Sequence, residues 1–131
     1  MSGGEAEALT KGVRVHVESR YYSERSSPLR GEYFFLYTIR ITNESDQIVQ
    51  LQSRHWIITD AEGRTEQVQG PGVVGKQPIL EPGGSFEYTS GCPLRTPFGV
   101  MRGTYQMVAR GGDAFEAEIP SFELSQPHGV H

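Results

Sequence analysis

The sequence predicts an all-β chain folded as a two-sheet antiparallel β-sandwich, and three observations lead to this fold class. Apolar and polar residues alternate over several short runs, as they do in strands that bury one face. The chain contains 16 glycines and 8 prolines, which is typical of many turns. No run has the 3.6-residue apolar period of an amphipathic helix. A length of 131 residues fits a single domain.

The first half of the chain contains the clearest strand patterns. Residues 1–10 are small and polar and are expected to form a flexible lead, so that the domain itself spans 11–125. Valines alternate with polar residues over 13–18, which predicts a half-buried strand. The strongest alternation is at 33–42, followed by the turn-forming residues 43–46.

A third strand is predicted over 48–59, where Val49 and Leu51 face inward. The simple alternation fails at 53–56, which suggests a bulge. A hairpin turn at 60–63 and a short polar edge strand at 64–69 are expected to follow.

The second half is predicted to contain three more strands. A loop at 70–78 leads to Pro82 and Gly83, which suit the central positions of a type II turn. Alternation then predicts strands over 85–90, 100–110 and 114–119, with an extension at 121–124, a loop at 93–99 and a flexible tail at 126–131. The predicted core includes Tyr37, Ile39, Tyr105 and Met107. About seven short strands match a sandwich of the immunoglobulin or fibronectin type III kind.

Composition excludes several classes of function. The net charge is −4 and no run of Lys or Arg occurs, so neither a nucleic acid nor an anionic membrane is an expected partner. No apolar stretch approaches the roughly 20 residues of a transmembrane helix. Cys92 is the only cysteine, so an internal disulfide cannot form, and a cytoplasmic location is expected.

A glycine-rich segment at 70–76 offers one candidate binding site. Its glycines fit the spacing G-x-G-x-x-G, but Pro78 and Pro82 prevent the helix that a dinucleotide site requires. Two interpretations stay open. The segment binds a small anion, such as a phosphate-containing molecule, through backbone amides, or its glycines serve only the geometry of a rigid loop. The candidate anion-binding residues are Gly70, Gly72, Gly75 and Lys76.

Arg54 and Trp56 form a second candidate site. Two residues apart on a strand, they share one face, and arginine beside tryptophan is typical of protein-binding hot spots. The alternative is that Trp56 belongs to the core and Arg54 stacks on its rim.

Catalytic and metal-binding patterns are weak. His55 and Cys92 could form a base and a nucleophile, but two such residues occur in most chains. The histidines at 16, 55, 128 and 131 show no cluster with the three or four ligands of a zinc site. We therefore expect no enzyme activity, no cofactor and no metal site.

Several longer motifs carry a family resemblance. They are SRHWIITD at 53–60, GPGVVG at 70–75, QP at 77–78, FEYTSG at 86–91, PFGVMRGTY at 97–105 and FEAEIP at 115–120. With these motifs the chain resembles the bacterial ApaG family, also called CorD, over nearly its whole length. The resemblance implies a fibronectin type III-like sandwich without established enzyme activity, and a loose association with cobalt and magnesium resistance. It also implies a protein-binding role, because similar domains occur in F-box proteins.

These observations favour a non-enzymatic module that binds an as yet unidentified protein partner. The main alternative is a protein that binds pyrophosphate or a nucleotide through the segment at 70–76.

Overall fold

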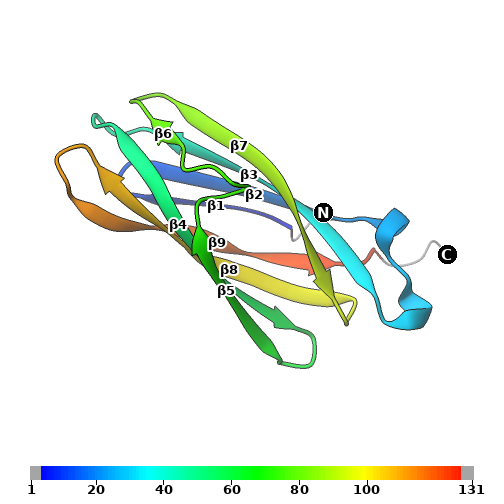
Figure 1. The fold of residues 1–131 in the computed structure, drawn as a ribbon. Helices are drawn as coiled ribbons and strands as arrows, with labels where there is room; N and C mark the ends of the chain where they lie inside the picture. The colour runs from blue at the N-terminus through cyan, green and yellow to red at the C-terminus, as the bar shows by residue number, and fades with distance from the viewer. Residues whose placement is uncertain (1–3, 128–131) are drawn as a thin grey trace.

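The structure is a computed structural model that describes residues 4–127, and within this range it is built almost wholly of antiparallel strands (Figure 1). The elements are β1 (Glu5–Thr10), β2 (Val13–Tyr21), η1 (Ser23–Arg25), η2 (Pro28–Arg30), β3 (Tyr33–Asn43), β4 (Val49–Asp60), β5 (Thr65–Pro71), β6 (Ile79–Leu80), β7 (Ser85–Leu94), β8 (Phe98–Ala109) and β9 (Ala114–Ser125). No helix in this part of the chain is long and apolar enough to cross a membrane.

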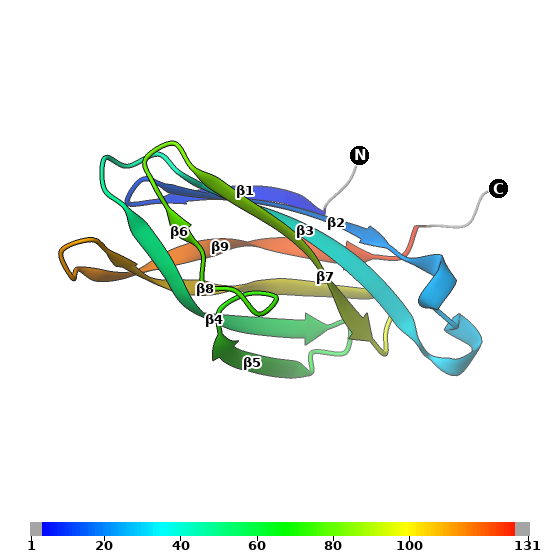
Figure 2. The ribbon, with the colours of Figure 1, turned by 45° about the horizontal axis from the view of Figure 1, so that its top comes forward.

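The strands form two sheets that pack face to face (Figure 2). The first sheet has the order β1-β2-β3-β7 and the second has the order β5-β4-β8-β9, with β6 pairing to the start of β4. This arrangement confirms the predicted antiparallel sandwich. Nine strands are present in the described residues rather than about seven, because β1 and the two-residue β6 lack a recognisable alternating pattern.

The core lies between the sheets and is filled by the alternating apolar residues of each strand. Val13, Val15 and Val17 of β2 are fully buried, as their period-2 spacing predicts. The four predicted core residues, Tyr37, Ile39, Tyr105 and Met107, are also buried. The register predicted from the sequence is therefore correct on the central strands of both sheets.

Two local predictions concern irregular backbone. The pairing of β4 with β8 shifts register between Leu51 and Ser53, so the alternation fails because of a bulge. A second bulge in the pairing of β8 with β9 accommodates Pro120 inside a strand that continues to Ser125. The predicted type II turn is present, since Gly83 has a φ of +85° and Gly84 donates to the carbonyl of Glu81.

The expectation of a flexible lead over 1–10 is wrong for its second half. Residues 5–10 form β1, which pairs with β2 from Glu5 opposite Glu18 to Thr10 opposite Val13. Alanine and glutamate have low strand propensity, but the ladder to β2 overrides that preference. The sequence feature that indicates this hairpin is Lys11-Gly12. Both residues have a positive φ, and together they form the two-residue turn between β1 and β2. Residues 1–3 lie outside the described part of the chain.

The predicted loop at 93–99 is shorter than expected. The predicted strand at 85–90 extends to Leu94, because β7 pairs with β3 as far as Tyr33, and β8 begins at Phe98. The predicted tail at 126–131 is described only at Gln126 and Pro127, which follow β9 without strand structure. Residues 128–131 lie outside the described range.

The sandwich is joined along one side and open along the other. On the joined side, the Glu118 amide of β9 donates to the Thr10 hydroxyl of β1, and the Ser19 hydroxyl of β2 donates to the Glu123 carbonyl. On the open side, β7 and β5 are the last strands of their sheets and do not pair with each other. This leaves two strand edges facing solvent beside the core (Figure 2).

Candidate functional site

Two adjoining clefts lie between the β7 and β5 sides of the sandwich. The larger, here called the end cleft, has a volume of about 870 Å³ and lies where the loops of η1 and η2 approach the hairpin joining β4 to β5. The smaller, here called the side cleft, has a volume of about 340 Å³ and opens further along β5. Ile58, Glu66 and Pro93 line both clefts, so together they form one groove.

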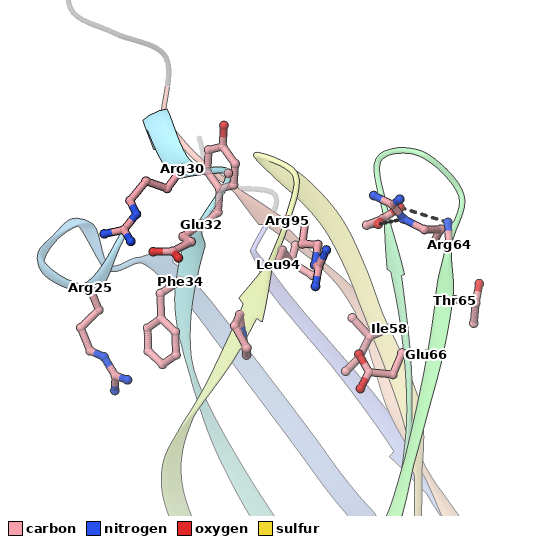
Figure 3. Close-up of a pocket in the computed structure, with 14 residues that line it drawn as sticks. Arg25, Arg30, Glu32, Phe34, Ile58, Arg64, Thr65, Glu66, Leu94 and Arg95 are labelled. Carbon is pink, nitrogen blue, oxygen red and sulfur yellow. Dashed lines mark hydrogen bonds and ion pairs between the residues drawn. The ribbon is translucent and has the colours of Figure 1, made fainter. Parts of the chain in front are cut away.

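Arginines from three separate segments line the end cleft, with Arg25 and Arg30 on one side and Arg95 nearer the hairpin that carries Arg64 (Figure 3). Arg25 ends η1, Arg30 ends η2, and Arg95 follows β7. Gly31 has a φ of +70°, a left-handed conformation that ends η2 and returns the chain toward β3. The short 3-10 turns therefore place Arg25 and Arg30 beside a strand edge that is distant in sequence.

Four arginines and three acidic residues line the end cleft, and the arginines differ in how they are paired. Arg64 also lines it, but its guanidinium contacts the Asp60 carboxylate at 3.0 Å and the Glu62 carboxylate at 2.9 Å. The Arg25 guanidinium lies 4.4 Å from the centre of the Phe34 ring, a cation–π arrangement. Within the described range, Arg30 and Arg95 form no ion pair, which leaves both free to meet an anionic group.

The side cleft is built around Arg54 of β4. The Arg54 Nη1 atom donates to the carbonyls of Pro71 and Gly72, at 2.9 Å in each case. A Cβ atom at Gly70 would lie 3.1 Å from the same nitrogen, so the guanidinium lies flat against the backbone at that glycine. The structure thus brings Arg54 and the glycine-rich segment together, although the sequence offered them as two separate sites.

Trp56 is a core residue. Its side chain is only 3% exposed, and its ring makes edge contacts with Tyr37, at 5.4 Å between centroids, and with Phe122, at 6.0 Å. The ring lines the side cleft but presents little surface to it, so the structure favours the alternative in which Trp56 packs inside and Arg54 lies at the rim. The prediction that Trp56 contacts a partner is not supported.

The glycine-rich segment forms a tight turn and no helix, as expected. Val73 and Lys76 exchange backbone hydrogen bonds, with Val74 at a φ of +41° and Gly75 at +79° between them. The Gly72 amide donates to the carbonyl of Gln52. The amides at 72, 73 and 76 are bonded within the chain, so these three are not free to cradle an anion. The Lys76 side chain is exposed.

The suggested catalytic pair is not assembled. His55 lies in the second sheet, where its Nε2 atom is 2.8 Å from the Gln67 side-chain oxygen. Cys92 is buried in the first sheet, and burial raises the pKa of its thiol to about 12. A thiol that stays protonated at neutral pH is a poor nucleophile.

One group of possible metal ligands occurs in the described residues, and it lies away from both clefts. It consists of Glu5, His16 and Glu18 on β1 and β2. The sequence does not predict this group, because residues 1–10 are expected from their composition to form a flexible lead and not a strand beside His16.

The two-sheet sandwich with its open, arginine-lined groove defines the class: a β-sandwich domain with a candidate binding surface. Comparisons with known proteins then show the family. The ApaG domain model matches residues 23–109. The chain is 57% identical over 121 residues to a protein ApaG of Methylorubrum extorquens, covering 92% of this chain and 93% of that one. A protein ApaG of Beijerinckia indica is 52% identical over 119 residues, covering 91% and 92%. The chain therefore belongs to the ApaG family.

Solved structures agree with this assignment. A Bordetella pertussis protein provisionally described as ApaA superposes with a TM-score of 0.88 at 51% identity, covering 93% of this chain and 99% of that one. The C-terminal domain of wzt superposes with a TM-score of 0.53 at 11% identity, covering 96% and 80%, and it shares the fold alone.

Proposed function

We propose that this chain is a non-enzymatic protein-binding module, and that its groove binds an extended acidic segment of a partner protein alongside β5. One observation carries this proposal: the outer edge of β5 borders both clefts, and at the end of the groove Arg30 and Arg95 form no ion pair within residues 4–127. The family resemblance supports a binding role, and its association with cobalt and magnesium resistance is a separate hypothesis. We infer a cytoplasmic location for the encounter from the absence of a disulfide.

The backbone of β5 supplies the first contribution to affinity. A strand at the end of a sheet presents unpaired N–H and C=O groups, and an extended segment can add to it as a further strand. Residues 65–70 contain no proline, so every second amide of this stretch, the ones not directed at β4, can donate on the outer side. Because the exposed side chains of β5 are polar, the edge is protected from pairing with other copies of the chain.

The arginines supply the second contribution. Around the end cleft, Arg25, Arg30 and Arg95 oppose only Glu32 and Glu66 once Arg64 is paired with Asp60. This local excess of positive charge contrasts with a net charge of −4 for the whole chain. Such a patch attracts acidic groups and fixes the register of a charged ligand.

The apolar floor of the groove supplies the third contribution. Ile58 and Val68 are partly buried side chains packed against the core, and both line the side cleft. Val74, which is 51% exposed, stands at its rim. An apolar side chain of the bound segment would cover this surface, while Arg54 faces its polar neighbour.

A peptide-display library of random linear segments, selected against the full chain, tests the proposal. We expect the selected peptides to be enriched in Asp and Glu beside an apolar residue. Their affinity for the chain, measured by fluorescence polarisation, should fall at least about tenfold in the double variant Arg30→Glu, Arg95→Glu and should weaken with added salt.

Arg110→Glu is the matched control, because Arg110 is an exposed arginine in the turn between β8 and β9, at the opposite end of the sandwich (Figure 1). It should leave the affinity within about twofold. Selection of peptides without acidic residues, or equal losses in Arg110→Glu and in the double variant, would overturn the proposal. Amide shifts mapped by NMR should lie along residues 65–70.

A further inference from the structure

A histidine and two glutamates meet on the outer face of the first sheet, at the edge farthest from the groove. Glu5 of β1 lies directly opposite Glu18 of β2, and His16 lies two residues from Glu18 on the same face. The His16 Nε2 atom is 2.9 Å from a Glu5 carboxylate oxygen. One possible ligand atom from each of the three side chains lies within 4.8 Å of the others.

Within residues 4–127, neither carboxylate is paired with a lysine or an arginine, and the His16 imidazole is the one basic group in contact with them. Like charges directly opposite each other on neighbouring strands destabilise the pair, so the pairing of Glu5 with Glu18 is unfavourable unless a positive charge joins them. Within residues 4–127, Glu18 forms no ion pair, and Glu5 contacts only His16.

Of the arginines on this face, Arg14 and Arg40 are engaged with other acidic residues, whereas Arg20, two residues beyond Glu18 on β2, forms no ion pair within residues 4–127. Arg14, which precedes His16 on the same face, pairs with Glu7 and with Glu44. Arg40 of β3 lies in register with His16, and its guanidinium is 3.6 Å from the Glu87 carboxylate. In the described part of this face, Glu18 thus has no ion pair, and the His16 imidazole is the basic group that contacts Glu5.

We propose that Glu5, His16 and Glu18 form a binding site for a divalent transition metal, and that it takes Zn²⁺. An imidazole with two carboxylates is a ligand set suited to zinc, which accepts three protein ligands and keeps an open position. Zinc ligands lie about 2.0–2.2 Å from the ion, so the side chains need only close slightly on it by rotation of the two exposed glutamates. Mg²⁺ and Ca²⁺ prefer sites composed of oxygen ligands and are not favoured by the imidazole.

The site would act as a clip on β1. Glu5 is the first residue of β1, whereas His16 and Glu18 belong to β2, which is paired on both sides. An ion that binds all three side chains therefore holds the N-terminal end of β1 in register with its neighbour, and binding would add to the stability of the folded chain.

Titration with Zn²⁺ alone, followed by calorimetry, tests the site. Two histidines near the C-terminus, His128 and His131, could bind Zn²⁺ by themselves, so the measurement uses the full chain carrying His128→Gln and His131→Gln. We expect one Zn²⁺ per chain in this background and an increase in the unfolding temperature on addition of Zn²⁺ but not of Mg²⁺. His16→Gln should weaken Zn²⁺ binding at least about tenfold, and Glu18→Gln should weaken it by a smaller factor.

His55→Gln is the matched control, because His55 is also a strand histidine with a side-chain hydrogen bond but lies outside the group of ligands. It should leave Zn²⁺ affinity unchanged. Loss of all binding when His128 and His131 are replaced, or equal affinity in His16→Gln and in the background, would overturn the proposal. The circular dichroism spectrum of each variant shows whether it is folded, so that a lost site is distinguished from a lost fold.

Discussion

The hydroxyl groups of Tyr88 and Tyr105 lie 2.6 Å apart and link the two sheets across the core. Tyr88 belongs to β7 in the first sheet, Tyr105 belongs to β8 in the second, and both side chains are buried. One hydroxyl donates to the other, and both side chains are largely removed from solvent. The pair therefore allows two polar groups to sit inside an otherwise apolar core.

Replacement of one member of this pair is expected to destabilise the fold. Tyr105→Phe leaves the Tyr88 hydroxyl buried without its partner, at a cost of about 1–3 kcal/mol in the free energy of unfolding. The double variant Tyr88→Phe, Tyr105→Phe removes both hydroxyls and should lose less than the sum of the two single variants. Urea unfolding of the four proteins measures the coupling, and strict additivity would show that the hydroxyls do not interact.

Stability is expected to fall at alkaline pH. Burial raises the pKa of Tyr105 and of Tyr88 well above the usual value, and it raises the pKa of Cys92 to about 12. Unfolded tyrosine ionises near pH 10, so above that pH the unfolded state releases protons that the folded state retains. The stabilising effect of the protonated groups is complete below the unfolded pKa values and is lost as pH rises through the folded ones.

Urea unfolding at a series of pH values between about 8 and 11 measures this loss. The Tyr88→Phe, Tyr105→Phe variant should show a shallower decline than the wild type. A wild-type stability that is independent of pH over this range would contradict the burial of these phenols.

Ile39→Ala tests the packing of the first sheet. Ile39 is fully buried in β3, and truncation of a buried aliphatic side chain costs about 2–5 kcal/mol. Ile79→Ala is the control, since Ile79 is 64% exposed and its truncation should change stability by about 0.5 kcal/mol or less. Equal losses at both positions in chemical denaturation would mean that β3 has a different register.

Gly72→Ala tests whether the glycine-rich segment serves geometry or binding. Gly72 has a φ of +61°, and a Cβ atom there would lie 2.3 Å from the Lys76 carbonyl oxygen. We expect a lower unfolding temperature with or without pyrophosphate, because both the conformation and the contact oppose a side chain.

Gly75→Ala separates the two causes. Gly75 also has a positive φ, of +79°, but a Cβ atom there meets nothing within 4 Å. It should therefore be less damaging than Gly72→Ala. If Gly72→Ala kept its stability and lost a measurable pyrophosphate affinity, anion binding through Lys76 would become the better hypothesis for this segment.

The Cys92 thiol is expected to react slowly in the folded protein. Its side chain is 3% exposed and its pKa is raised by burial, so little thiolate is accessible at neutral pH. Labelling with a chromogenic disulfide reagent should be slow under native conditions and rapid in denaturant. Fast native labelling would indicate that the core opens locally beside the side cleft.

Local patterns were sufficient to predict the central strands. The valines of β2 and the alternation around Ile39 assign each side chain to one face, because successive residues of a strand point in opposite directions. Pro82 and Gly83 restrict the backbone to one turn type whatever surrounds them. The same local logic failed at β1, where the residues favour no strand and only pairing with β2 orders them.

The two candidate sites depend on contacts between residues far apart in the sequence. Arg30 and Arg95 reach one cleft because β3 and β7 pair and bring the segments before and after them together. Likewise, Glu5 meets His16 only because the hairpin at Lys11-Gly12 folds β1 back on β2 in one register. The residues of each cluster are too far apart in the sequence for their spacing to predict a site.

By itself, the sequence determined the fold class, the faces of the central strands and the family resemblance, because each of these depends on patterns of residues that are close together along the chain. Only the tertiary structure decided that Trp56 is buried, that Arg54 holds the carbonyls of the glycine-rich segment, and that one side of the sandwich is open. Those features follow from which strands lie at the edges of the two sheets. Which strands lie at the edges depends on how whole strands pair. The free energy of that pairing comes from many contacts between residues far apart in the sequence, so no local sequence pattern predicts it.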